Sequence, residues 1–136
     1  MTAFDNQYLL LVFASTCGAL QMVASYKGLH GLTFFRNRYV TFIVGIIMLI
    51  SSFAWFFLSE PRNVPDTAAG LSGNEQFGLF SLAAGCATIF TLLFSSLRNY
   101  NLGNKLDSFQ PGLDALKETT YARALLRTLK SMGKVW

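Results

Sequence analysis

Long stretches without a charged residue dominate the first two thirds of this chain. Three stretches contain no Asp, Glu, Lys, Arg or His; they run from Tyr8 to Tyr26, from Tyr39 to Ser59 and from Gln76 to Leu97, and hold 19, 21 and 22 residues. As α-helices they would measure roughly 28 to 33 Å, and the hydrocarbon of a bilayer is about 30 Å thick. Helices satisfy their own backbone polar groups in lipid. The pattern predicts three transmembrane helices, at about residues 8–26, 39–59 and 76–97.

Composition and the placement of aromatic residues agree with a lipid environment. Hydrophobic residues make up 52% of the chain and charged residues 13%, whereas soluble domains carry about a quarter charged residues. Tyr8, Tyr26 and Tyr39 stand at the ends of the apolar runs, and such rings prefer the headgroup level of a bilayer. The expected fold class is therefore an all-α integral membrane protein, with a transmembrane domain over residues 1–97.

The basic residues are concentrated on one side of the predicted spans. The segment between the first two spans carries Lys27, Arg36 and Arg38 and no acid, and all but one of the other basic residues follow the third span. The exception is Arg62, which shares its side with the acids Asp5, Glu60, Asp66 and Glu75. Loops rich in Lys and Arg stay in the cytoplasm. We therefore expect the amino terminus outside and the carboxyl terminus in the cytoplasm, in a bacterial inner membrane or its organelle equivalent.

The last segment, residues 98–136, is expected to form a cytoplasmic tail. After the break at Pro111-Gly112, the spacing predicts a helix over about residues 113–133. One face would carry Tyr121, Leu125, Leu129 and Met132, and another the basic residues Arg123, Arg127, Lys130 and Lys134. A C-terminal amphipathic helix of this kind is typical of helices at an anionic, cytoplasmic membrane surface. Two alternatives stay open: docking on an acidic partner subunit, and a solvated basic face that only follows the charge rule.

Small and weakly polar residues recur along the predicted spans at spacings of three and four. Such residues let membrane helices approach closely and form hydrogen bonds with each other. The candidates in the first span are Ala14, Gly18, Gln21 and Ser25; in the second, Gly45 and Ser52; in the third, Ser81, Gly85, Thr88 and Ser95. These faces either close the three helices on each other or dock them on another protein.

The most polar of these residues is Gln21, for which we expect one interhelical hydrogen bond; the alternative is a role as a ligand or pathway group. Cys17 and Cys86 lie within apolar runs and are expected to pack as small apolar residues.

A cluster of cations is expected at the inner membrane surface. Lys27, Arg36, Arg38 and Arg98 converge there, beside His30. The cluster is suited to a lipid phosphate, a quinone headgroup or an anionic partner. The alternative is that it reflects only the charge rule for membrane topology.

Several kinds of chemistry are excluded by what the sequence lacks. His30 is the only histidine, so this chain alone does not supply two axial histidines to a haem. No carboxylate or lysine lies within a span, where ion and proton carriers usually need one. We also find no hydrolase, zinc-protease or nucleotide-binding motif. The sequence predicts no catalytic and no metal-binding residue, no enzyme activity, and no cofactor held by this chain alone.

The function expected from these features is that of an accessory or structural subunit of a larger multi-subunit membrane complex, such as a respiratory, photosynthetic or other oxidoreductase. Its partners would be other membrane protein subunits and anionic lipids, not nucleic acid. Bound lipid is expected, and a quinone or pigment would be shared with partner subunits. The alternatives are a small homo-oligomeric transporter or channel, and a lipid- or quinone-binding membrane protein.

Overall fold

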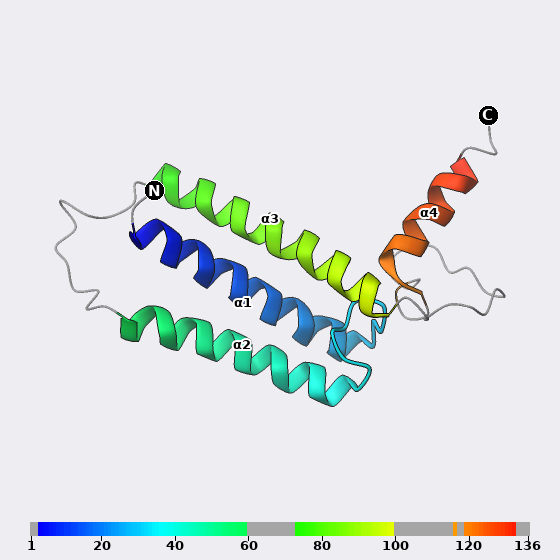
Figure 1. The fold of residues 1–136 in the computed structure, drawn as a ribbon, viewed down its shortest axis with the longest axis horizontal. Helices are drawn as coiled ribbons and strands as arrows, with labels where there is room; N and C mark the ends of the chain where they lie inside the picture. Colours follow the sequence, from blue (N-terminus) through cyan, green and yellow to red (C-terminus); the bar gives the residue numbers. More distant parts are fainter. Residues whose placement is uncertain (1–2, 60–72, 100–115, 117–118, 133–136) are drawn as a thin grey trace.

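The structure is a computed structural model that describes residues 3–59, 73–99, 116 and 119–132. Four α-helices make up most of these residues (Figure 1). The helices are α1 (Ala3–Lys27), α2 (Arg38–Ser59), α3 (Gly73–Arg98) and α4 (Tyr121–Met132). The first three are long and apolar enough to cross a membrane, which confirms the predicted all-α fold with three long apolar helices that could span a membrane. Part of the predicted tail helix lies outside the described residues, namely residues 113–115, 117–118 and 133, and so does Lys134.

The long helices extend beyond the apolar runs that predicted them. α1 begins five residues before Tyr8, and its first turn holds Asp5; α3 likewise holds Glu75 in its first turn. Acids are favourable at helix amino termini, where the macrodipole is positive. Lys27 and Arg98 occupy the last turns of α1 and α3, where a cation is favourable for the same reason. At their amino ends α1 and α3 therefore include the acid that precedes the apolar run, and both helices end at the cation that follows it.

Local capping sets the two helix ends at the α1–α2 connection. Gly28 has a φ of 68°, and the N–H groups of Gly28 and Leu29 donate to the carbonyls of Ser25 and Ala24, at 3.2 and 2.8 Å. This is a Schellman ending, which favours glycine because of the positive φ. Asn37 caps α2, since its Oδ1 accepts from the N–H of Tyr39 at 2.9 Å.

The three long helices lie in a single row, with α1 between α2 and α3 (Figure 1). Among the described residues, α2 and α3 make no contact with each other. Of the 18-residue apolar stretch of α2 only 22% is buried within the chain, and of that of α3 only 17%. Most of the apolar surface of these two helices therefore faces lipid or another protein.

Glycine governs the contact between α1 and α2. A Cβ on Gly18 would lie 2.8 Å from the carbonyl oxygen of Gly45, and a Cβ on Gly45 would lie 2.8 Å from that of Gly18. The two backbones thus approach as closely as small residues allow. Ser25 and Ser52 are also buried, and Ala14 is half-buried.

The contact between α1 and α3 uses a row of small residues spaced by four: Ala83, Ala87, Thr91 and Ser95, all fully buried. Cys17 of α1 packs against this row, because its Sγ lies 3.9 Å from the carbonyl oxygen of Ala87 and 3.7 Å from Oγ1 of Thr91. Cys86, on α3, is exposed and free. Only Cys17 is therefore a packing residue within this chain.

The tail helix is shorter than predicted. α4 begins at Tyr121, and Thr119 and Thr120 before it are not helical. The carbonyl of Thr120 accepts the N–H of Ala124 at 3.0 Å, so Thr120 occupies the N-cap position. Threonine is favoured there and is unfavourable inside a helix, which explains the later start. α4 runs across the direction of the three long helices (Figure 1).

Candidate functional site

One end of the bundle gathers most of the predicted cations. α1 and α3 end there and α2 begins there, and the 28–37 loop joins α1 to α2 (Figure 1). Lys27, Arg36, Arg38 and Arg98 are all exposed at this end, as is His30. We call it the basic end; the opposite end, with Asp5 and Glu75 in the first turns of α1 and α3, is the acidic end.

Gln21 holds the 28–37 loop against the bundle. It is 0% exposed; its Oε1 accepts the N–H of Phe34 at 2.7 Å, and its Nε2 donates to the carbonyl of Leu32 at 3.2 Å. Gln21 lies six residues before the end of α1, roughly 9 Å along the axis, so the loop folds back along the last turns of that helix. The expectation of an interhelical hydrogen bond was wrong: Gln21 satisfies loop backbone instead.

The folded-back loop inserts an aromatic ring against α3. Phe34 is buried, and its ring lies edge-on to Phe94 and Phe90, with centroids 5.0 and 6.4 Å apart. Asn99 donates from Nδ2 to the carbonyl of Thr33 at 2.8 Å. The loop thus closes the basic end between α1 and α3, and the carbonyls of Leu32 and Thr33 and the N–H of Phe34 all have side-chain partners from the helices or their ends.

Three of the predicted cations lie over aromatic rings. Lys27 is 5.6 Å from the ring of Tyr26, Arg38 is 5.4 Å from that of Tyr39, and Arg98 is 5.5 Å from that of Phe35. These distances are within the range of a cation–π interaction. Rings and charges at one level are the arrangement expected of residues that anchor a protein at the headgroup layer.

Two tail residues that precede α4 also pack on the 28–37 loop. The N–H of Gly31 donates to the carbonyl of Leu116 at 2.8 Å, and Leu116 is buried. A Cβ on Gly31 would overlap the carbonyl oxygen of Thr119. The N–H of Ala122 donates to Oγ of Ser96 at 3.3 Å. The cations of α4 are therefore tethered to the basic end: Arg123 and Arg127 are half-buried and Lys130 is exposed.

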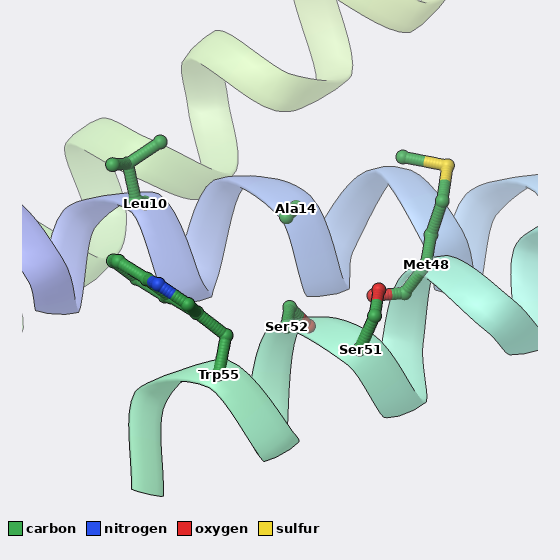
Figure 2. A pocket seen from close by; sticks show the side chains of 6 residues that line it. All are labelled: Leu10, Ala14, Met48, Ser51, Ser52 and Trp55. Atoms are coloured by element: carbon green, nitrogen blue, oxygen red, sulfur yellow. The ribbon is translucent and has the colours of Figure 1, made fainter. Parts of the chain in front are cut away.

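A shallow groove of about 400 Å³ opens between α1 and α2 (Figure 2). It lies between the Gly18–Gly45 contact and the ring contact of Phe4 with Phe56, whose centroids are 5.9 Å apart. Trp55 rises toward Leu10, with Met48 at the other end (Figure 2); the lining residues are Leu10, Ala14, Met48, Ser51, Ser52 and Trp55. The lining is suited to an apolar side chain or a lipid tail.

The predicted helix-packing residues divide into two groups. Gly18, Gln21, Ser25, Gly45, Ser52 and Ser95 are buried within the chain, and Ala14 is half-buried. Ser81, Gly85 and Thr88 are exposed on α3, and nothing lies within 4 Å of a Cβ placed on Gly85. Among the described residues none of the three is buried against another helix, and the alternative in which they dock on another protein stays a prediction. We call these three the α3 stripe.

Sequence reasoning missed the residues that close the basic end. Gly31, Thr33, Phe34 and Asn99 were not candidates, although a glycine and an asparagine beside a span are visible signals. The row Ala83, Ala87 and Thr91 was also overlooked, in favour of the neighbouring α3 stripe. Among the residues that the structure describes, no three His, Cys, Asp or Glu side chains gather as metal ligands would. The site presents cations, rings and apolar surface.

No protein-family model matches this chain, and neither a curated protein nor a solved structure matches it.

Proposed function

We propose that this chain is an accessory subunit of a larger multi-subunit membrane complex, in which its transmembrane helices pack on other membrane subunits. The observation that supports this most is the α3 stripe, exposed on a helix that contacts only α1 and α4 among the described elements. Small residues gain little by facing lipid tails, but they let a second helix approach closely. A partner helix would pack closely against Gly85, as α1 packs at Gly18 against Gly45 of α2.

The row arrangement adds to this proposal. A three-helix protein that works alone buries more surface when its helices form a triangle, in which each helix contacts two others. Within the part of the chain that the structure describes, α2 and α3 each contact α1 but not one another. A flat row exposes both broad faces, and such a shape fits along the side of a larger assembly.

A Gly85→Leu variant tests the proposal. The protein would be purified from its source membrane in mild detergent, and co-migrating chains identified by native gel and mass spectrometry. We expect stable companions in a fixed ratio with the natural sequence, and a loss of at least about tenfold in their recovery with Gly85→Leu.

The matched control is Cys86→Leu, which places the same side chain at an exposed neighbouring position outside the stripe. It should retain the companions. Migration of the natural chain alone would contradict the proposal, and migration as a homo-oligomer would favour a small transporter or channel instead.

The proposed orientation places the basic end in the cytoplasm and the acidic end outside, in a bacterial inner membrane or its organelle equivalent, because loops rich in Lys and Arg stay inside. His30 and Asn74 are exposed at opposite ends. In a background without Cys17 and Cys86, we expect a membrane-impermeant maleimide to label Asn74→Cys in intact cells. His30→Cys should react only after permeabilisation, and the reverse pattern would overturn this orientation.

A further inference from the structure

The faces of α4 differ sharply in chemistry. Leu125, Leu126 and Leu129 are exposed, Leu126 by 65%. Arg123, Arg127 and Lys130 are spaced by four and three residues, and their arc on a helix of 100° per residue is about 60° wide. Among the described elements, α4 contacts only α3. An apolar face of this size beside a basic arc is the composition of a helix that lies in a membrane interface.

The docking of the tail fixes where this helix lies. The backbone of Gly31 contacts Leu116 and Thr119 directly, and Ser96 accepts the N–H of Ala122. These contacts hold the first turn of α4 at the basic end, and the helix then points away from the bundle in a direction transverse to the long helices (Figure 1). With the three long helices crossing a bilayer, this direction lies along the bilayer surface.

The residues around the first turn of α4 are of the kind found at the depth of the lipid headgroups. Lys27, Arg38 and Arg98 lie over aromatic rings at this end of the bundle, where interfacial rings and cations belong. The cations of α4 continue that positive surface. Charge complementarity therefore favours anionic phospholipid as the occupant, with the exposed leucines among the acyl chains.

We propose that α4 is an interfacial helix that binds the surface of an anionic bilayer, and that the contact of Gly31 with Leu116 and Thr119 fixes its position there. The proposal does not depend on the function proposed above. Each basic residue contributes an attraction that is screened by salt, so binding is expected to weaken as the salt concentration rises.

The test uses the full-length protein in nanodiscs, with a spin label on Leu126→Cys in a background without Cys17 and Cys86. Nanodiscs of phosphatidylcholine with about 30% phosphatidylglycerol would be compared with phosphatidylcholine alone. We expect the label to be reached by oxygen, which is lipid-soluble, rather than by a water-soluble nickel complex, in the anionic discs only. The double variant Arg127→Gln/Lys130→Gln should lower the equilibrium constant for binding of α4 to the bilayer surface by about 30-fold.

The matched control is Arg36→Gln/Arg38→Gln, which removes two charges from the basic end but none from α4. It should change the equilibrium constant for binding of α4 to the bilayer surface by less than about twofold. Gly31→Ala should broaden the distance distribution between labels on Leu126→Cys and Asn74→Cys; an unchanged narrow distribution would overturn the positioning role of Gly31.

Three results would overturn the proposed binding of α4 to an anionic bilayer. The label on Leu126→Cys could be water-accessible in both lipids, or equally buried in both, which would remove the requirement for anionic lipid. It could also be buried only when a companion chain or a second copy is present, as cross-linking would detect, and α4 would then be a protein-docking helix. Because the charge variants leave the Gly31 contact intact, they give a result even if Gly31→Ala fails to fold.

Discussion

Replacing Gly45 by leucine is expected to separate α1 from α2 and to lower the free energy of unfolding by roughly 3 kcal/mol, the upper end of the usual cost of overpacking. The new Cβ would lie 2.8 Å from the carbonyl oxygen of Gly18 and 3.1 Å from the backbone nitrogen of Met22. Neither backbone atom moves without shifting a whole helix. The measurement is titration of the purified protein with sodium dodecyl sulfate in mixed micelles, followed by fluorescence.

Gly85→Leu is the matched control for this experiment, because a Cβ on Gly85 meets nothing within 4 Å. It should leave the free energy of unfolding of the isolated chain within about 0.5 kcal/mol of the natural value. Equal destabilisation by the two variants would show that the close backbone contact of Gly18 with Gly45 does not limit the side-chain size that α1 and α2 tolerate.

Replacing Gln21 by leucine is expected to release the 28–37 loop. Leucine fills a similar volume but leaves the N–H of Phe34 and the carbonyl of Leu32 without their partner. Each unsatisfied buried backbone group costs roughly 1–3 kcal/mol, and lipid offers no replacement. We expect a loss of about 2–4 kcal/mol in the free energy of unfolding, and hydrogen exchange at the Phe34 amide at least about tenfold faster.

Gln76→Leu makes the same chemical change at an exposed position of α3. It should alter neither the free energy of unfolding nor the exchange of the Phe34 amide. If Gln21→Leu also left that amide protected, the loop would be held mainly by the packing of Phe34 on Phe90 and Phe94, and the role assigned to Gln21 would be wrong.

The spans could be predicted because lipid imposes one simple requirement, a charge-free run of sufficient length. The ends of the helices could not be predicted from the length of a charge-free run alone, because end charges and capping residues also set them. Asp5 and Glu75 interrupt the runs but stabilise helix amino termini, so α1 and α3 begin earlier than the runs suggest. Thr120 acts the other way, because a good capping residue starts α4 later than the hydrophobic periodicity indicated.

Packing faces were harder to predict, because α3 carries two neighbouring rows of small residues. Ala83, Ala87 and Thr91 face α1, while Gly85 and Thr88 remain exposed. Helical spacing produces both rows equally well, and the choice depends on the surface that α1 presents. For the same reason the partners of Gln21 could not be predicted, since the return of a loop is decided by tertiary contacts.

The order of synthesis gives the hydrogen bonds of Gln21 a further consequence. Gln21, Leu32 and Phe34 all belong to the first hairpin of the chain, and their hydrogen bonds span 11 and 13 residues. Phe90 and Phe94, the ring partners of Phe34, are made much later. A hairpin of α1 and α2 therefore already pairs the N–H of Phe34 and the carbonyl of Leu32. The carbonyl of Thr33 and the N–H of Gly31 gain their partners only later, when Asn99 and Leu116 have been made.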